Sequence, residues 1–557
     1  MHNLDLRKSG SLSIEDSKRV SFLADAVGIE YNNYIGELIE LNKIEGIQFI
    51  LRLVCRNTYM SKIYDRMCRL ALLEDRLKNG EIYTSIITDS NKMKSPIRTL
   101  LNKYHSNAKL KVEDSQLSKL SFIYPLYSII RNLYICINLW ILPKFIRFNQ
   151  NPVDEIYILD TFIFKDSFDK KLKFNDRYYL DLIHNLDLNK RNKIWYLPTL
   201  NVLQFPWEWL KLFRQIAQSK ENIMLKENWL KFSDYSSSFL QSITLGNAIK
   251  VIPEWRGINI SGLVSEEVFL ERGSFSITQA LLIYHFFKRI KNKGVKVNGV
   301  IDWYENQNID RALYLGLREN YPNTKIKGYL GFVPQNYYLC LWPLKYELKG
   351  RVLPDEILVI GQKYISSIKK FLPEMKVSAA PAFRFKNTMK YSHTSNKNKN
   401  IILLAMPMII DEARNIINIA SKVNRYKEYK WLIKVHPTMS QSQFQNKIPE
   451  SINSQFKFID KKNITELFHE THLLVTTASS TCMEALVCGV PVSIIGNRSG
   501  PTINPLVGVV DQKYWSVSYT SIDLEKNIDK AYLKFELNSD SLFLKISQEE
   551  VRGMMKF

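Results

Sequence analysis

Short apolar runs alternate with longer stretches of helical periodicity from about residue 81 onward. Runs rich in apolar and β-branched residues occupy 82–88, 155–164, 194–200, 297–304, 326–333 and 356–361. The stretches between them carry apolar residues at three-to-four spacing, which is typical of amphipathic helices. This alternation predicts a parallel sheet with helices on both faces.

The same pattern begins again after Leu372. The predicted strands of this second part are 377–383, 401–407, 431–437, 456–460, 473–479 and 492–496. The chain is therefore expected to contain a second doubly wound domain, with the boundary near 370–376. Because ligands of open α/β sheets bind beyond the carboxyl ends of the strands, a site is expected in the residues that follow each strand.

The first 80 residues show a mostly helical pattern. Ser13, followed closely by Glu15, is a helix start, and residues 34–54 carry apolar positions at three-to-four spacing. A chain of 557 residues also exceeds the roughly 250–300 residues that one hydrophobic core serves. We therefore predict a helical extension at 1–80, a Rossmann-like domain at 81–372, a second at 373–557, and a cleft between the two lobes.

The most apolar stretch of the chain is 122–148. Arg131, Asn132 and two prolines interrupt it, which argues against a helix that spans a bilayer. Two interpretations stay open. The stretch is either a buried core helix or an amphipathic segment on an acidic membrane face, the latter favoured by Lys144, Arg147 and the aromatic residues.

Composition adds a preference for anionic partners. The chain has 77 Lys and Arg against 55 Asp and Glu, a net charge of +22, which favours phosphorylated substrates, acidic lipid or nucleic acid. The six cysteines form no CxxC pair, so neither a zinc site nor a disulfide framework is predicted. A reducing, cytoplasmic compartment is expected, because the polar first residues also lack the apolar core of a secretory signal.

A hydroxyl-rich turn separates a predicted strand from a predicted helix in residues 476–492, TTASSTCMEALVCGVPV. The strand ends at Thr477 and the helix begins near Ser480, so free backbone N–H groups and the helix dipole attract a phosphate. Glu484, one turn into the helix, is placed to reach a ribose hydroxyl. An ordinary N-cap is the alternative explanation of Ser479 or Ser480.

His436 and Pro437 directly follow the predicted strand 431–435. A histidine there can donate to a phosphate oxygen, and the proline fixes the turn that places it. A backbone carbonyl that satisfies the ring is the alternative. With one further predicted strand between this pair and the hydroxyl-rich turn, the two features together are more informative than either alone.

The HP pair, the T-A-S-S-T turn and the E-A-L-x-x-G-x-P-V segment together resemble the C-terminal half of bacterial GT-B glycosyltransferases of surface polysaccharide synthesis. The most similar types are the CMP-sugar users, namely sialic acid, polysialic acid and 3-deoxy-octulosonate transferases, with CDP-glycerol transferases as neighbours. The resemblance spans roughly 295–510. It implies a GT-B-like fold, a nucleotide-sugar donor in place of a cofactor, and a nucleotide phosphate held by His436, Pro437, Ser479, Ser480 and Thr481 beside Thr477.

The absence of several metal-binding and nucleotide-binding motifs disfavours other classes of enzyme. No D-x-D triplet occurs, so metal-bridged pyrophosphate binding is not expected, and a metal-independent mechanism that uses the helix dipole, His436 and basic residues is preferred. Neither a G-x-G-x-x-G after a strand nor a phosphate-binding P-loop is present, which disfavours dinucleotide oxidoreductases, kinases and ATPases. Four cations in or near predicted loops or strand ends are candidates for contact with an anionic sugar: Arg256, Arg272, Arg384 and Lys434.

Residues 300–313, VIDWYENQNIDRAL, supply the candidate general base. Asp302 and Glu305 follow the strand that ends at Ile301, where an acceptor hydroxyl must lose its proton. The families resembled place an acidic base in this domain, commonly in two acidic residues followed by glycine, a motif that this sequence lacks. Glu305 is the first choice, with Asp302 and Asp160 as alternatives, and a charge satisfied by the helix dipole is the other explanation of Glu305.

Together these features predict an inverting glycosyltransferase at the cytoplasmic face of the inner membrane. It would move a nonulosonic or octulosonic acid from a CMP donor onto a surface glycan such as lipopolysaccharide O-antigen or capsule. Its expected partners are the nucleotide sugar, a glycan or lipid-linked acceptor, and anionic lipid. A UDP-sugar or CDP-glycerol transferase and a non-catalytic scaffold of the same fold stay open, as does a basic nucleic-acid-binding protein, although no nucleic-acid-binding signature occurs.

Overall fold

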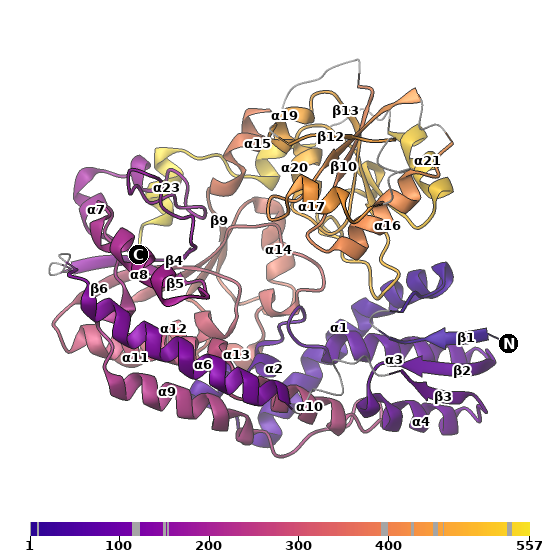
Figure 1. Cartoon of the computed structure of the whole chain (residues 1–557), viewed down its shortest axis with the longest axis horizontal. Coiled ribbons are helices and arrows are strands. Elements are labelled where there is room, and N and C mark those ends of the chain that lie inside the picture. Colours follow the sequence, from indigo (N-terminus) through magenta and orange to yellow (C-terminus); the bar gives the residue numbers. More distant parts are fainter. Residues whose placement is uncertain are drawn as a thin grey trace.

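Three parallel sheets organise the described residues, two with six strands and one with three (Figure 1). All of their strand pairs are parallel. The computed structural model describes the chain apart from residues 1, 8–9, 114–122, 149–151, 153–154, 392–398, 425–427, 449–454, 461 and 532–536.

The first six-stranded sheet has the order β5-β4-β6-β7-β8-β9. Its strands are β4 (Glu155–Ile163), β5 (Ile194–Leu200), β6 (Lys296–Trp303), β7 (Lys325–Leu330), β8 (Glu356–Val359) and β9 (Val377–Ala379). The helices of this part include α8 (Pro206–Gln218), α9 (Phe232–Thr244), α11 (Phe275–Lys291) and α12 (Asn308–Asn320). The strand order reverses between β4 and β6, so the carboxyl ends of these two strands form the switch point at which α/β sheets bind ligands.

The second six-stranded sheet has the order β12-β11-β10-β13-β14-β15. Its strands are β10 (Ile401–Ala405), β11 (Lys430–Lys434), β12 (Lys457–Phe458), β13 (Thr471–Thr476), β14 (Val492–Ile495) and β15 (Trp515–Ser518). Its helices include α16 (Ile410–Ala420), α20 (Thr481–Val487) and α21 (Ser521–Lys530). The order reverses between β10 and β13, and the prediction of two doubly wound, Rossmann-like domains is confirmed.

The N-terminal part departs from the predicted helical extension. Its three-stranded sheet is formed by β1 (His2–Asp5), β2 (Tyr83–Thr88) and β3 (Lys109–Val112), and its helices include α1 (Ile14–Asn42), α3 (Ile63–Lys78) and α4 (Lys94–Lys103). Strand β2 pairs with β1 and β3, not with the sheet of the domain predicted at 81–372. The four-residue β1 is too short and polar to show a strand pattern, so the sequence did not reveal this partner. We call residues 2–113 the N-terminal module.

The end of the chain also departs from the predicted boundaries. After the second sheet come two short helices, α22 (Ser539–Leu542) and α23 (Gln548–Met554). The Phe557 ring stacks on Tyr157 of β4 at 5.4 Å, and the Lys327 Nζ of β7 donates to the carbonyl of Lys556 at 2.8 Å. The residues after 537 therefore pack against the first domain, although the sequence assigned 373–557 to the second.

A buried ion cluster fastens the N-terminal module to the first domain. Arg56 donates to Glu347 Oε1 at 2.8 Å and to Asn32 Oδ1 at 2.9 Å, and Arg311 of α12 donates to the same Glu347 oxygen. The side chains of Arg56, Arg311 and Glu347 are all 0% exposed. Because a charge left unpaired at such a site is costly, the three side chains hold the two parts in a fixed relation.

The apolar stretch at 122–148 forms α6 (Ile123–Ile141) and a short 3₁₀ turn (Leu142–Phe145). One side of α6 packs into the core through Ile135, Cys136 and Leu139. The opposite side is exposed. The core-helix interpretation thus holds for one face of the helix, while Phe122 lies outside the described residues.

Candidate functional site

The predicted hydroxyl-rich turn lies at the switch point of the second sheet. Thr476 Oγ1 donates to the carbonyl of Ala405 at 2.8 Å, which joins the ends of β13 and β10. Thr477 Oγ1 donates to Glu412 Oε2 of α16 at 3.1 Å. The two threonines thus fix the strand end from which the turn begins.

Helix α20 begins at Thr481, one residue later than the sequence indicated. Ser479 Oγ accepts the backbone N–H of Thr481 at 3.2 Å and donates to Thr481 Oγ1 at 3.0 Å. Ser480 occupies the N-cap position, but its side chain makes no capping hydrogen bond. The N-cap explanation therefore does not apply to the Ser480 hydroxyl, while the local bonds of Ser479 are those expected of a structural turn residue.

His436 follows β11, and within the described part of the chain its hydrogen-bond partner is Thr438. Its Nδ1 accepts the backbone N–H of Thr438 at 3.3 Å and lies 2.7 Å from Thr438 Oγ1. Because Nδ1 accepts, the proton of the neutral ring is assigned to Nε2, which can donate to a ligand. Burial lowers the pKa of His436, which favours this neutral form. Pro437, the next residue, is exposed.

Glu484 contacts the segment that joins the two domains. Its Oε2 accepts from Thr388 Oγ1 at 2.6 Å, and Thr388 belongs to α15 (Lys386–Lys390). Burial raises the pKa of Glu484, and the Thr388 bond and the charge of Arg384 oppose that rise. The carboxyl thus helps to pack α20 against α15, and its contact with a ribose stays a prediction.

Glu305 lies just beyond β6, with its carboxylate surrounded by donors. Oε1 accepts from Trp303 Nε1 at 3.1 Å, and Oε2 accepts from the Tyr338 hydroxyl at 3.2 Å and from Gln307 Nε2. Burial raises the pKa of Glu305, and these bonds and the charge of Arg384 oppose the rise. Its side chain is only partly buried, as a general base that receives a substrate proton requires.

The helix-dipole explanation fits Asp310 better than Glu305. Helix α12 begins at Asn308, three residues after Glu305. Asp310 Oδ2 accepts the backbone N–H groups of Gln307 at 2.8 Å and of Glu305 at 3.0 Å. The charge at this helix start is therefore supplied by Asp310, and Glu305 is left outside the helix.

Asp302, predicted as an alternative base, lies inside the protein. The sequence placed the end of its strand at Ile301, but β6 continues through Trp303, so Asp302 pairs with Gly328 in the interior of the sheet. Its side chain is 0% exposed and accepts from the Tyr314 hydroxyl. Asp160 is likewise interior, because β4 runs on to Ile163. Neither carboxyl reaches the protein surface in this structure.

Arg384 acts on both halves of the predicted site. It lies in the short 3₁₀ helix Phe383–Phe385 after β9, and its guanidinium is 5.7 Å from the centroid of the Trp303 ring. Burial raises the pKa of both Glu305 and Glu484, and the charge of Arg384 opposes that rise in each. Arg384 is itself exposed, so a cation is presented where the two domains meet.

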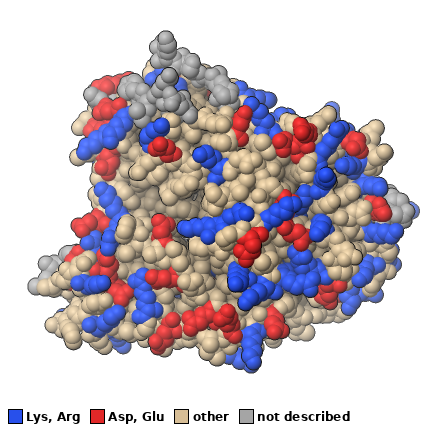
Figure 2. All heavy atoms as spheres, turned by 180° about the vertical axis from the view of Figure 1, so that it is seen from behind, with Lys and Arg blue, Asp and Glu red and all other residues tan. Residues whose placement is uncertain are grey.

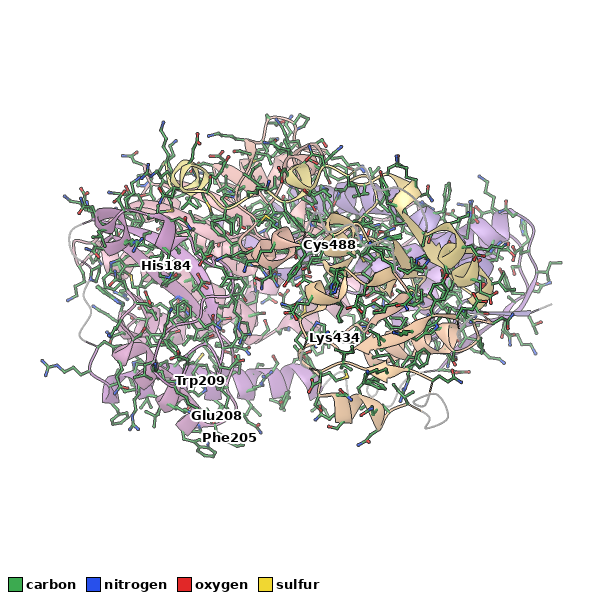
Figure 3. All side chains as sticks on the ribbon, turned by 90° about the horizontal axis from the view of Figure 1, so that it is seen from above. His184, Phe205, Glu208, Trp209, Lys434 and Cys488 are labelled. Atoms are coloured by element: carbon green, nitrogen blue, oxygen red, sulfur yellow. The ribbon has the colours of Figure 1, made fainter. Side chains whose placement is uncertain are left out.

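The other three candidate cations have partners of their own. Arg256 pairs with Glu30 at 2.7 Å and with Glu74 at 2.8 Å. Arg272 donates to Asn247 Oδ1 at 2.9 Å. Lys434, which Figure 3 places on the side of the second domain that faces the first, donates to a backbone carbonyl at 2.5 Å. Arg384 is therefore the strongest of the four as a ligand for an anion.

A cleft of about 1850 Å³ opens between the N-terminal module and the second domain. The second domain lines it with residues that include Glu412, Thr477 and Asn497, and the N-terminal module lines it with residues that include Tyr59 and Lys62. Thr477 is the one predicted site residue in this lining. The predicted residues outside it are Asp302, Glu305, His436, Pro437, Ser479, Ser480, Thr481 and Glu484.

The wall formed by the N-terminal module was missed by the sequence reasoning. Tyr59 connects this wall to Glu305, because its ring packs edge-on against Tyr338 at 4.7 Å and the Tyr338 hydroxyl donates to Glu305. Nothing in the local sequence around Tyr59 indicates a site. Gly496 and Asn497, by contrast, directly follow the buried strand β14. They could have been predicted, because ligands of open α/β sheets bind beyond the carboxyl ends of the strands.

Comparison with known proteins gives only a weak structural likeness. No family model matches the chain, and no curated protein matches it. The S. aureus MnaA-UDP co-structure is 11% identical over 72% of this chain and 95% of its own, with a TM-score of 0.39. A UDP-GlcNAc 2-epimerase from Neisseria meningitidis is 12% identical over 72% and 98%, with a TM-score of 0.38. The wall teichoic acid polymerase TagF is 11% identical over 78% and 96%, with a TM-score of 0.34.

At these identities and TM-scores the likeness defines no activity for this chain. Its own sheets describe the fold directly: two doubly wound parallel sheets, each with one switch point, and a chain end that returns to the first domain. The fold is GT-B-like.

The charge distribution argues against the alternative of a nucleic-acid-binding protein. Figure 2 shows Lys and Arg mixed with Asp and Glu over the rear face of the protein. Many basic side chains are also engaged in ion pairs, for example Arg19 with Asp75 and Arg289 with Asp234. A nucleic-acid backbone favours a basic stripe clustered on one face, which this face does not present.

Proposed function

We propose that the chain is an inverting, metal-independent glycosyltransferase that uses a nucleotide-sugar donor, with a CMP-linked nonulosonic or octulosonic acid as the preferred donor. The observation that carries the proposal is the position of Arg384, an exposed cation whose guanidinium lies 5.7 Å from the centroid of the Trp303 ring, the side chain that donates to Glu305. Its charge also favours the ionised form of both Glu305 and Glu484. A cation at this junction suits a donor that is anionic at both its sugar carboxylate and its phosphate.

Glu305 is the proposed general base. Its carboxylate takes the proton of the acceptor hydroxyl as that oxygen attacks the anomeric carbon. Burial raises the pKa of Glu305, which makes the ionised carboxylate a stronger base, and the bonds from Trp303 and Tyr338 keep it ionised and oriented. A single displacement of this kind inverts the configuration of the anomeric carbon.

His436 and the turn before α20 are proposed to receive the departing phosphate. The Nε2–H of neutral His436 donates to a phosphate oxygen, because Nδ1 is held by Thr438. The Ser480 hydroxyl, which makes no capping bond, supplies a second donor. The leaving group is then CMP, stabilised by hydrogen bonds in place of a metal ion.

The acceptor is proposed to be a growing surface glycan, met at the cytoplasmic face of a membrane. The excess of basic side chains suits anionic lipid at that face. Binding of the nucleotide donor does not require the membrane, so the donor can be tested on the protein alone.

A thermal-shift screen with CMP, CDP, UMP, UDP and GDP tests the proposal. A ligand that binds only the native state raises the melting temperature, so CMP is expected to stabilise the wild type and to lose that effect in His436→Ala. His469→Ala is the matched control, because His469 pairs with Glu470 away from the turn. Stabilisation by UDP or CDP in place of CMP would change the donor, and a response to none of the five nucleotides would overturn the proposal.

A further inference from the structure

Helix α6 exposes an apolar face to solvent from Ile123 to Ile137. Eight apolar or aromatic side chains on it are each at least 41% exposed: Ile123, Tyr124, Leu126, Tyr127, Ile130, Leu133, Tyr134 and Ile137. Their spacing of three and four residues makes one continuous stripe, which we call the α6 face. A soluble domain ordinarily turns such a stripe inward, so the α6 face points to an interaction partner.

The other side of α6 is fixed to the first domain. Asn132 Nδ2 is fully buried and donates to Thr278 Oγ1 at 2.8 Å, to the carbonyl of Gly273 at 3.1 Å and to Ser242 Oγ at 3.2 Å. Among the described residues, Ile123–Phe145 is the one segment long and apolar enough to cross a bilayer. Its packed side prevents it from spanning a membrane while the domain is folded, so it can only lie on one.

The charged side chains within the α6 segment itself are all basic. Residues 123–148 contain no Asp or Glu, and Arg131, Lys144 and Arg147 are exposed. Lys144 Nζ lies 3.8 Å from the centroid of the Trp140 ring. Long basic side chains and Trp beside an apolar stripe are the composition of helices that rest on anionic bilayers.

Neighbouring elements extend the exposed apolar surface. Phe205 and Trp207, at the start of α8, stack at 4.5 Å, and the Tyr134 hydroxyl ties α6 to this segment through the carbonyl of Gln204 at 3.1 Å. Figure 1 shows α6 running across the front of the first domain, and Figure 3 shows Phe205 pointing away from the protein on that side. Phe232 of α9, 60% exposed, packs at 4.9 Å from Trp140.

We propose that the α6 face docks the protein on an anionic phospholipid bilayer. The N-terminal end of α6 also borders the cleft, since Ile123, Tyr124 and Tyr127 belong to its lining. Docking therefore brings the cleft next to the membrane surface. If the proposed function holds, on which this last step rests, an acceptor attached to lipid enters the cleft along Tyr124 and Tyr127.

Vesicle sedimentation of the full-length protein tests the docking. Phosphatidylcholine vesicles with and without phosphatidylglycerol are compared for the wild type, Leu126→Glu/Ile130→Glu and Lys144→Ala/Arg147→Ala. The wild type is expected to sediment with the anionic vesicles only. The first variant is expected to bind at least about tenfold more weakly, and the second about fivefold more weakly per cation removed. Ile522→Glu, on α21 of the second domain and 62% exposed, is the control that retains binding.

Four results would overturn the docking. Three concern the vesicles: no binding of the wild type to either kind, equal binding of the wild type to both, and unchanged binding of Leu126→Glu/Ile130→Glu. The fourth is a wild-type dimer in solution that becomes monomeric in this variant, because the α6 face would then bind a second copy of the chain. Leu126 and Ile130 are both exposed, so the melting temperature of the variant without ligand is expected to stay close to that of the wild type, which shows that the variant is folded. If CMP stabilises no protein while the vesicle results hold, the proposed donor fails and the docking stands.

Discussion

The Tyr338 hydroxyl donates to Glu305 Oε2 at 3.2 Å, from a residue 33 positions farther along the chain. Tyr338 in turn packs edge-on against Tyr59 of the N-terminal module, which lines the cleft. The candidate base is therefore oriented by a side chain that also contacts the cleft wall. Two aromatic rings thus connect the cleft wall to the carboxylate.

Replacement of Glu305 by Gln is expected to abolish most transfer activity. An amide keeps much of the hydrogen-bonding shape but cannot accept a proton, and general base catalysis typically contributes about 10²–10⁴-fold. Sugar transfer is the measurement, with nucleotide-induced stabilisation retained as evidence that the donor still binds. The control is Glu319→Gln, at an exposed carboxylate of α12. Full activity in Glu305→Gln would remove Glu305 from the mechanism.

Replacement of Tyr338 by Phe is expected to move the acidic limb of the pH profile toward higher pH. Burial raises the pKa of Glu305 and the Tyr338 bond opposes that rise, so loss of the bond lets the pKa rise further. The base is then protonated, and inactive, up to a higher pH. The readout is kcat/KM against pH for both proteins, and an unshifted profile would show that Tyr338 does not position the base.

Replacement of Glu347 by Gln is expected to reduce the free energy of unfolding by about 3–5 kcal/mol, because Arg56 and Arg311 would lose their buried counter-ion. Denaturant unfolding measures the effect. Glu374→Gln, at an exposed carboxylate, is the comparison and should change little. Equal stability of the two variants would show that the cluster does not hold the N-terminal module in place.

Replacement of Asp302 by Asn is expected to stabilise the protein at alkaline pH. Burial and the neighbouring Asp160 raise the pKa of Asp302 well above its usual value. A raised pKa means that the stability Asp302 contributes is complete in acid and is lost as the pH rises through the folded-state pKa. The unfolding free energy of Asp302→Asn should therefore fall less between mildly acidic and mildly alkaline buffer than that of the wild type. A parallel fall in both proteins would contradict the assignment.

Much of the fold could be predicted because its strands are buried on both faces. Strand β5 is buried at all seven positions and β13 at all six, and each contains a short apolar run that the sequence shows clearly. Asp302 shows the limit of that rule. A single carboxylate within a strand looks like a strand end, and only the pairing with β7 shows that the strand continues.

The N-terminal module shows a different limit. Its β1 pairs with β2 across about 80 residues, and although the sequence indicates the strand at 82–88, it gives no sign that the two segments are partners. The cleft wall at Tyr59 belongs to the module that the buried Glu347 cluster joins to the first domain. The positions of His436 and Ser480 after their strands could be predicted from the sequence, whereas the position of Tyr59 in the cleft wall follows only from the contacts between distant segments.

The return of residues 537–557 to the first domain sets the order in which the protein can mature during translation. The ring of Phe557 fills the space over Gly299, where a side chain on β6 would approach it to 2.4 Å. A ribosome synthesises this ring only after the whole second domain has been synthesised, so this patch of the first sheet stays uncovered until then. Nascent chains of this protein are therefore expected to be more exposed to chaperones and proteases than the completed molecule, and the two lobes are best expressed as one polypeptide.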